Sequence, residues 1–366
     1  MTLDATTVER IDVQAYTIPT DQPEGDGTLQ WDSTTIVVVH AHAGETAGLG
    51  YTYADVSTAK LIETKLAGVV EGMPASSPRA SWAAMVKATR NLGRQGITSM
   101  AIAAVDLALW DLHARLLDTP LCTVLGMAHD HVPVYGSGGF TTYTNDRLQE
   151  QLAGWAEQGI PRVKMKIGAH PDQDCERVRA AREAIGPSVE LFVDANGAYE
   201  RKQALQFADA FHEQSSVSWF EEPVSSDDLE GLRILRDRTP AGMAIAAGEY
   251  GYDAVYFRRM LDAGAVDVQQ ADVTRCAGIT ELLRIAGLCR AHCIPLSCHC
   301  GPAIHVHPAC AIDGLIHLEY FHDHVRIEEL LLDGLPELRD GALWPDLSRP
   351  GNGLSLRHSN AAQYSV

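Results

Sequence analysis

Three carboxylates at near-equal spacing are the residues of this chain best suited to chemistry. Asp194, Glu221 and Glu249 each close a short apolar run, and the intervals between them are 27 and 28 residues. This interval fits one strand, one helix and two short loops, so it predicts three neighbouring parallel strands with the carboxylates at their C-terminal ends, where a (β/α) barrel keeps its active site. Three hard oxygen ligands suit Mg2+ and leave positions for water and substrate.

Two lysines precede this set. Lys164 and Lys166 alternate with Val163, Met165 and Ile167, so both amines face the same side of the expected strand, and a solvated edge is disfavoured. Two ammonium groups so close are expected to lower one another's pKa, which favours a neutral amine that acts as a base.

A second acid/base group is expected beyond the carboxylates. Asp272 and His299 end successive apolar runs 27 residues apart. An Asp beside a His holds the ring, selects its tautomer and raises its basicity. Glu319 closes the next run and is placed to donate a proton to a substrate oxygen. The set predicts removal of the α-proton of a carboxylate substrate, with the metal, Lys164 and Glu319 stabilising the intermediate.

The elements that must position these groups follow a strand–helix rhythm from residue 132 onward. Amphipathic stretches at 172–185, 201–213 and 279–291 alternate with short apolar runs. Eight such runs at this spacing predict a TIM-type barrel. The expected strands are Val132–Gly136, Arg162–Ile167, Val189–Val193, Ser218–Phe220, Ala244–Ala247, Ala265–Gln270, Ile294–Cys298 and Leu315–Glu319.

Residues 1–130 differ from the barrel segment 131–325. Antiparallel strands are expected at 11–18 and 34–41, and helices at 57–70 and 99–117, which together indicate an α+β domain. The polar segment 21–33 between the strands is the expected lid, mobile without ligand. Residues 326–366 lack barrel periodicity and are expected to pack on the N-terminal domain.

Composition narrows the possible partners. The 366 residues carry a net charge of −19, which argues against binding nucleic acid or anionic membranes. No apolar run approaches the roughly 20 residues that span a bilayer, and the first residues lack a signal-peptide pattern. Eight cysteines in such a chain are expected to be reduced thiols. A cytoplasmic protein is therefore expected.

The motifs resemble those of the enolase superfamily, in its mandelate racemase subgroup, across nearly the full chain. They are Ala103-Ala104-Val105-Asp106-Leu107-Ala108-Leu109-Trp110-Asp111-Leu112, Lys164-Met165-Lys166, Val193-Asp194-Ala195-Asn196, Phe220-Glu221-Glu222-Pro223, Gly248-Glu249, Asp272-Val273-Thr274-Arg275-Cys276-Ala277-Gly278-Ile279-Thr280 and Ser297-Cys298-His299.

The resemblance implies a (β/α)7β barrel with an N-terminal capping domain completed by the C-terminal tail, and a homo-oligomer of two to eight chains. It implies Asp194, Glu221 and Glu249 as Mg2+ ligands and Lys166 as the base on one face. It also implies an Asp272/His299 dyad on the other face, with Glu319 as electrophilic helper. Expected substrate contacts are Lys164, Asn196, Trp31 and Ser137.

Dehydration of an acid sugar to a 2-keto-3-deoxy acid is the leading expectation, because the resemblance implies that such dehydratases are frequent in the subgroup. The polar side chains of segment 21–33 suit hydroxyl groups, although Trp31 does not. The alternative is racemisation, epimerisation or cycloisomerisation of a carboxylate, which two opposed bases allow equally. A non-catalytic binding module would show no Mg2+ dependence.

Two features depart from the family pattern. Ala271 stands where a proline is common, and Cys298 and Cys300 flank His299. A zinc site is an alternative, but the spacing is too close for usual zinc ligands and buried thiols are favoured. His322 and His324 follow the expected eighth strand and either reach the substrate or lie in a loop, and the loop is favoured. The residues of the zinc alternative are Cys293, Cys298, His299, Cys300, His305, His307 and Cys310.

Overall fold

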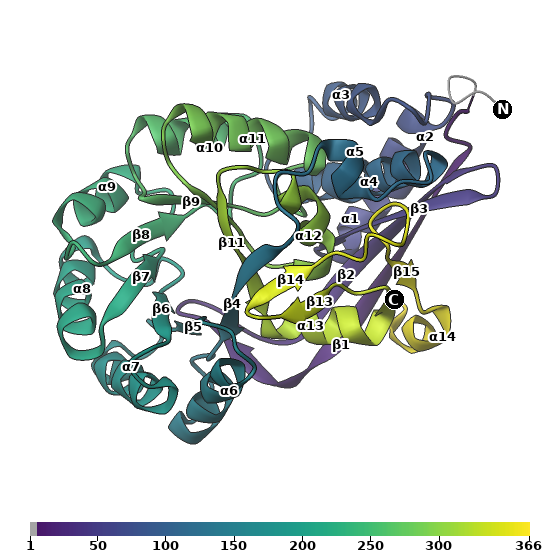
Figure 1. Ribbon diagram of the computed structural model, residues 1–366. Coiled ribbons are helices and arrows are strands. Elements are labelled where there is room, and N and C mark those ends of the chain that lie inside the picture. The colour runs from purple at the N-terminus through teal and green to yellow at the C-terminus, as the bar shows by residue number, and fades with distance from the viewer. Residues whose placement is uncertain (1–5) are drawn as a thin grey trace.

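A closed parallel barrel forms the larger part of the molecule (Figure 1). The computed structural model describes residues 6–366. Seven helices connect eight strands, and the last strand pairs in parallel with the first, so the predicted (β/α)7β barrel is confirmed. The strands are β4 (Val132–Gly138), β5 (Arg162–Lys166), β6 (Glu190–Asp194), β7 (Val217–Glu221), β8 (Ala244–Ala247), β9 (Val268–Ala271), β10 (Leu296–Cys298) and β11 (Leu315–Phe321). The helices are α6 (Asn145–Glu157), α7 (Pro171–Ile185), α8 (Arg201–Ser215), α9 (Leu229–Arg238), α10 (Ala254–Asp262), α11 (Ile279–Ala291) and α12 (Pro302–Cys310).

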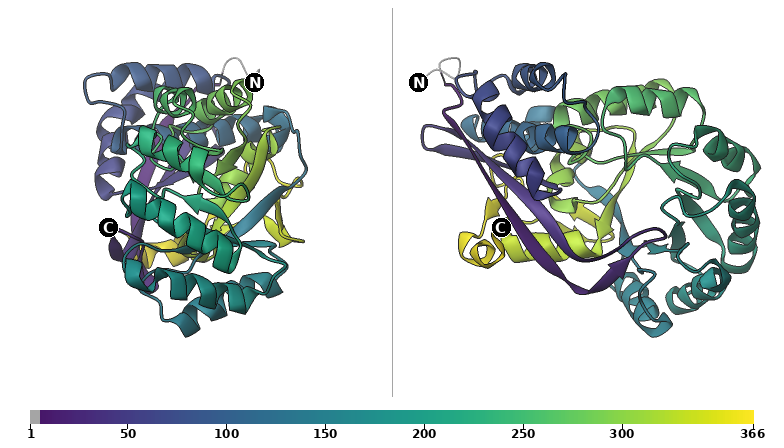
Figure 2. Two further views of the ribbon diagram at one scale, coloured as in Figure 1. Left: turned by 90° about the vertical axis from the view of Figure 1, so that its left-hand side faces the viewer. Right: turned by 180° about the vertical axis from the view of Figure 1, so that it is seen from behind.

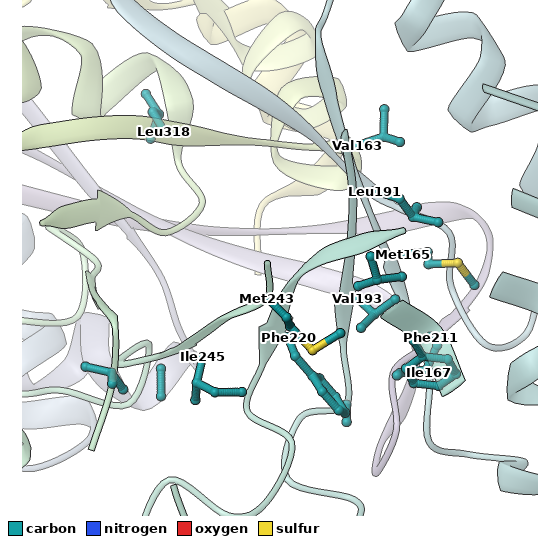
Figure 3. Close-up of a cluster of buried hydrophobic side chains, with 14 of the residues drawn as sticks. Val163, Met165, Ile167, Leu191, Val193, Phe211, Phe220, Met243, Ile245 and Leu318 are labelled. Atoms are coloured by element: carbon teal, nitrogen blue, oxygen red, sulfur yellow. The ribbon is translucent and has the colours of Figure 1, made fainter. Parts of the chain in front are cut away.

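Along β5, apolar side chains that pack against the helices alternate with charged side chains that face the inside of the barrel. Val163 and Met165 of β5 lie in a hydrophobic cluster that includes side chains of the surrounding helices, such as Phe211 of α8 (Figure 3). Lys164 and Lys166 therefore point to the opposite side of the strand, into the barrel. A separate buried cluster of side chains from the other strands fills the lumen. Its members are Tyr135, Phe192, Trp219, Ala246 and Val268.

The N-terminal part is an antiparallel sheet covered by helices. Its strands β1 (Arg10–Gly25), β2 (Gln30–Ala43) and β3 (Thr46–Tyr53) form a meander. Helix α4 (Ile97–Leu116) packs on β3, where a Cβ at Gly48 would lie 2.2 Å from the backbone of Leu112. α4 is long and apolar enough to cross a membrane, but 83 % of its most apolar window is buried inside the protein. It is the core helix of the cap.

Several expected elements differ from those observed. β3 and helix α3 (Pro78–Ala88) were not predicted. The glycines of β3 argue against a strand in sequence, yet they are what allows α4 to approach. The helix expected at 57–70 is divided into α1 (Val56–Leu61), the π-helix η2 (Ile62–Leu66) and α2 (Ala67–Val70).

The tail contacts both parts of the molecule. Asp111 of α4 accepts hydrogen bonds from Leu49 N and Asn352 N, both at 2.6 Å, which joins the tail to the cap. A strand of the tail also pairs antiparallel with β4, so the tail touches the barrel too. Helix α13 runs across the boundary expected at residue 325. The tail elements are α13 (His322–Leu331), β12 (Leu332–Asp333), β13 (Glu337–Arg339), β14 (Ala342–Trp344), β15 (Ser355–Leu356), α14 (His358–Ala361) and the 3-10 helix η3 (Ala362–Tyr364).

Segment 21–33, expected as a polar lid between the two strands, is itself part of a strand hairpin. β1 and β2 continue to Gly25 and Gln30 across a register shift after Pro19. The hairpin extends from the cap to the barrel (Figure 2), where Thr141 N donates to Gly25 O at 2.8 Å. A Cβ at Gly27 would lie 2.2 Å from Ala195 O, so the tip sits directly on the loop after β6. The structure therefore shows this hairpin closed over the barrel.

Glu24 is a buried carboxyl near the end of this hairpin. Its Oε2 accepts a hydrogen bond from Trp31 Nε1 at 2.9 Å, and its Oε1 has no hydrogen-bond partner. Burial and the nearby Asp323 carboxylate raise the pKa of Glu24 from 4.5 to about 9. The folded protein holds this proton at neutral pH, whereas the unfolded chain releases it. Folding stability is therefore lost as pH rises from about 4.5 towards 9.

Replacement of Glu24 by Gln is expected to stabilise the protein in a pH-dependent way. The amide stays neutral and its oxygen can still accept from Trp31 Nε1, so the variant avoids the proton uptake. We expect a gain of about 1–3 kcal/mol near pH 8 that shrinks towards zero near pH 5. Thermal unfolding at both pH values measures it. An equal shift at the two pH values would contradict the assigned cause.

Candidate active site

The three carboxylates converge at the C-terminal ends of adjacent strands. Asp194 and Glu221 are the last residues of β6 and β7 and are register partners, and Glu249 follows β8. All three are buried, and one oxygen from each lies within 4.8 Å of the others. The positive φ of Gly248 turns the chain at the end of β8, where a Cβ would lie 2.1 Å from Gln270 O. The geometry is that of a three-carboxylate cation site.

The residues fit a divalent cation. Burial and the Asp194 carboxylate raise the pKa of Glu221 to about 8, because without a cation the negative charges repel one another. Glu249 Oε2 is buried without a hydrogen-bond partner. The other carboxylates are oriented by donors: Asn196 N donates to Asp194 Oδ1 at 2.9 Å, and Trp219 Nε1 donates to Glu221 Oε2 at 3.0 Å. An all-oxygen set of this kind suits Mg2+.

Both lysines are paired with carboxylates, which corrects the expectation of a neutral amine: Lys164 does lower the pKa of Lys166, but the carboxylates outweigh this effect. Lys164 Nζ lies 2.5 Å from Glu221 Oε1 and 2.9 Å from Glu319 Oε1, and Lys166 Nζ lies 2.5 Å from Asp194 Oδ2. Burial alone would lower the pKa of each lysine, but the carboxylates outweigh it, so both pKa values lie above the usual one. A cation bound to the same carboxylates would offset this effect.

The His299 ring lies on the other side of the cluster. Its Nδ1 is 2.9 Å from Asp272 Oδ2, while Asp272 Oδ1 accepts from Thr274 N at 2.7 Å. Burial lowers the pKa of His299, but the charges of Glu249 and Glu319 and the Asp272 hydrogen bond raise it above its usual value. The same pairing holds the pKa of Asp272 below its usual range despite burial. His299 lines the cavity, and its Nε2 lies 3.3 Å from Cys300 Sγ and 3.5 Å from Glu249 Oε2.

A cavity of about 380 Å3 lies between the barrel and the cap. Lys166, Asn196, Glu249 and His299 line it, and Trp31 reaches it from the hairpin. Lys164 and Ser137 are fully buried and do not line it. Asp26 of the expected lid and Cys300 of the zinc alternative also line it. Further lining side chains for which the sequence predicted no role are Tyr53, Asp55, Tyr250 and Arg275.

Arg275 is the lining residue that the sequence could have flagged, since it lies inside a quoted motif. Its Nη1 donates to Glu249 Oε1 at 3.1 Å, and its Nε lies 3.8 Å from Asp272 Oδ2. The guanidinium thus bridges the carboxylate cluster and the Asp272/His299 pair.

His322 and His324 belong to helix α13, not to a loop as expected. His324 stacks on Tyr53 with ring centroids 3.4 Å apart and lines the cavity. His322 Nε2 lies 3.1 Å from Asp21 Oδ2.

The seven residues of the zinc alternative do not form one ligand group within residues 6–366. Cys298 and Cys310 are buried in the barrel's hydrophobic cluster. His305 Nε2 accepts a hydrogen bond from Val273 N at 2.8 Å. Only His299 and Cys300 share a group, and their partner is Glu319.

Asp272→Asn tests the pairing with His299. The substitution removes the negative charge that orients the His299 imidazole and favours its protonated form, so we expect kcat to fall by about 10²–10³-fold. Because the Asp272 hydrogen bond raises the pKa of His299, its loss should move the acid limb of the kcat/KM profile to lower pH. A pH–rate series on the variant measures both. An unchanged profile at wild-type rate would contradict the pairing.

Comparison with known proteins agrees with this geometry. Residues 11–126 match the family described as mandelate racemase / muconate lactonizing enzyme, N-terminal domain, and residues 147–360 match the one described as enolase C-terminal domain-like. The chain belongs to the mandelate racemase subgroup of the enolase superfamily. The resemblance predicted from the motifs is thereby confirmed.

Individual members of this superfamily differ in the reactions they carry out. The chain is 30 % identical to a 3,6-anhydro-alpha-L-galactonate cycloisomerase from Streptomyces coelicolor. That match covers 98 % of this chain and 99 % of the cycloisomerase. It is also 30 % identical to an L-talarate/galactarate dehydratase from Salmonella typhimurium. That match covers 84 % of this chain and 77 % of the dehydratase.

Solved structures of the superfamily share the fold closely. A mandelate racemase/muconate lactonizing enzyme-like protein from Rubrobacter xylanophilus superposes with a TM-score of 0.97 at 60 % identity, covering 98 % of this chain and all of that one. A racemase from Streptomyces coelicolor, solved with bound magnesium, superposes with a TM-score of 0.91 at 29 % identity, covering 98 % of this chain and 100 % of that one.

Proposed function

We propose that this protein removes the α-proton of a carboxylate substrate in a Mg2+-dependent reaction, and that the reaction is dehydration of an acid sugar to a 2-keto-3-deoxy acid. The single observation that carries the proposal is that Lys166 on β5 and His299 after β10 flank the three strands whose ends carry Asp194, Glu221 and Glu249, and that both line one cavity. The magnesium-bound relative supports the choice of ion.

Mg2+ held by the three carboxylates would supply positive charge for the negative charge that develops on the substrate carboxylate. The protein groups then divide the proton chemistry. Lys166 or His299 removes the α-proton, and His299 in its protonated form returns a proton to the departing 3-hydroxyl. Lys164, which pairs with Glu319 beside the cluster, adds positive charge that stabilises the intermediate. The charges of Lys164 and His299 hold the pKa of Glu319 below its usual value despite burial, so Glu319 orients Lys164 and does not donate the proton expected from the sequence.

The polarity of the cavity supports a polyhydroxylated substrate. Asp26 and Ser33 from the hairpin, and Asp55 and Thr35 nearby, offer hydroxyl and carboxylate groups on the cap side. Arg275 adds positive charge on the barrel side. Closure of the hairpin tip over the barrel loops would exclude water from the reaction. Assembly into a homo-oligomer and a cytoplasmic location stay predictions.

Cycloisomerisation is the second candidate, because one relative that matches almost end to end is a cycloisomerase. Both reactions begin with the same α-proton transfer, so the same residues serve either. The reactions differ in their products.

A panel of acid sugars and sugar lactones, incubated with the enzyme and Mg2+, separates the two. Dehydration gives a 2-keto acid that is lighter than the substrate by one water. Cycloisomerisation of a lactone or anhydro acid eliminates the ring oxygen within the same molecule and gives a 2-keto acid of unchanged mass, so mass spectrometry of the semicarbazone separates the two. We expect the semicarbazone of a dehydrated product from at least one open-chain acid sugar. Keto acid from lactones or anhydro acids alone, with no loss of water, would overturn dehydration in favour of cycloisomerisation.

A further inference from the structure

Cys300 adds a soft ligand to the inner wall of the cavity. It follows His299 in sequence and adopts a positive φ of 51°, which directs its thiol to the same side as the imidazole. Cys300 Sγ lies 3.3 Å from His299 Nε2 and 3.5 Å from Glu319 Oε2, and the remaining separation, from His299 Nε2 to Glu319 Oε2, is 3.6 Å. Sulfur, nitrogen and oxygen thus form a nearly equilateral triangle.

These separations match a tetrahedral zinc site. With Zn–S near 2.3 Å and Zn–N or Zn–O near 2.0–2.1 Å, ligands at the tetrahedral angle lie about 3.3–3.6 Å apart. The set of one thiolate, one imidazole and one carboxylate is also the mixture that zinc prefers and Mg2+ does not. Adjacent residues rarely share a zinc ion, but here the left-handed backbone at Cys300 brings both ligand atoms to one side.

The surrounding charges leave these three atoms available. Glu319 uses Oε1 to bind Lys164 Nζ at 2.9 Å and presents Oε2 to the triangle, where Cys300 N donates to it at 3.1 Å and the thiol at 3.5 Å. His299 uses Nδ1 for Asp272, so its Nε2 faces the thiol and, at 3.5 Å, Glu249 Oε2. Asp272 thus acts as the outer partner that orients a zinc-binding imidazole. His299 and Cys300 both line the cavity, so a fourth position is open.

We propose that His299, Cys300 and Glu319 form a zinc site inside the active-site cavity, beside the carboxylate cluster, whose Glu249 Oε2 lies 3.5 Å from His299 Nε2. Binding displaces the thiol proton, and the Nε2 proton of a protonated imidazole, to solvent and occupies His299 Nε2, the nitrogen that faces the cavity. Zn2+ is then an inhibitor that acts while Mg2+ stays bound. The inhibition rests on the proposed function of His299, but the binding does not.

Co2+ is a direct probe, because a cobalt–thiolate bond gives a charge-transfer band in the near ultraviolet and carboxylates do not. The full-length enzyme is saturated with Mg2+ and titrated with Co2+, and Zn2+ is then added as competitor. We expect the band in wild type, its displacement by about one equivalent of Zn2+, and its loss in Cys300→Ser. Equilibrium dialysis should show Zn2+ affinity at least about tenfold weaker in that variant.

Cys298→Ser is the matched control, since this thiol flanks the same histidine but packs in the hydrophobic cluster outside the barrel. It should keep the band. A wild type without the band, a band that survives Cys300→Ser, or a band lost in Cys298→Ser would each overturn the site. Circular dichroism checks that the variants fold. Should Zn2+ bind without slowing turnover, the site would stand and the role of His299 in the proposed function would fail.

Discussion

Replacing Glu221 by Gln is expected to abolish turnover and to weaken Mg2+ binding. The substitution keeps the shape of the side chain but removes one of three anionic ligands, and it frees Lys164 from its 2.5 Å ion pair. Loss of a ligand and of the charge stabilisation it carries should lower kcat by at least about 10³-fold. Calorimetric titration with Mg2+ and a single-turnover assay measure the two effects.

A carboxylate at the other end of the same barrel provides the control. Glu190 begins β6 and pairs with Arg162 at 2.9 Å near the surface. Glu190→Gln is expected to keep both activity and Mg2+ affinity. A Glu221→Gln variant that turns over at the rate of Glu190→Gln would show that the metal site has been misassigned.

Removal of either proposed base is expected to have an effect of similar size. Lys166→Ala and His299→Asn should each lower net turnover by about 10²–10⁴-fold, the range attributed to a positioned acid or base. Asn at 299 can still hydrogen bond to Asp272, so the loss reports on proton transfer more than on packing.

Solvent exchange separates the two bases. In D2O, the base that removes the α-proton also catalyses its exchange, so the variant that keeps this base should still incorporate deuterium when turnover is lost. The Lys166→Ala/His299→Asn double variant should do neither. Exchange that persists in the double variant would mean that another group is the base.

Regular spacing made most of the barrel and the convergence of the three carboxylates predictable. One strand–helix unit has a nearly constant length, so Asp194, Glu221 and Glu249 could be assigned to adjacent strands from the intervals alone. Alternation with apolar residues likewise predicted that Lys164 and Lys166 face the lumen, and both side chains are buried, in agreement with this prediction. These inferences depend on local periodicity, which a single sequence carries.

Contacts between distant segments were not predictable. The lysine pKa values depend on carboxylates from three other strands, and those charges outweigh the mutual repulsion that the local sequence indicates. The glycines of β3 allow the backbone of α4 to approach closely, a contact between distant segments that the local sequence does not show. The meeting of Cys300 with Glu319 requires the register of β10 with β11 and a left-handed turn at Cys300.

Proton NMR of acid sugars in D2O with the wild-type enzyme tests the central claim most directly. The account predicts that the C2 proton of at least one acid sugar is lost when Mg2+ is present, that chelation of Mg2+ stops the loss, and that the double variant lacks it. Loss of the C2 proton that continues after chelation, or in the double variant, would contradict Mg2+-dependent proton abstraction by Lys166 and His299.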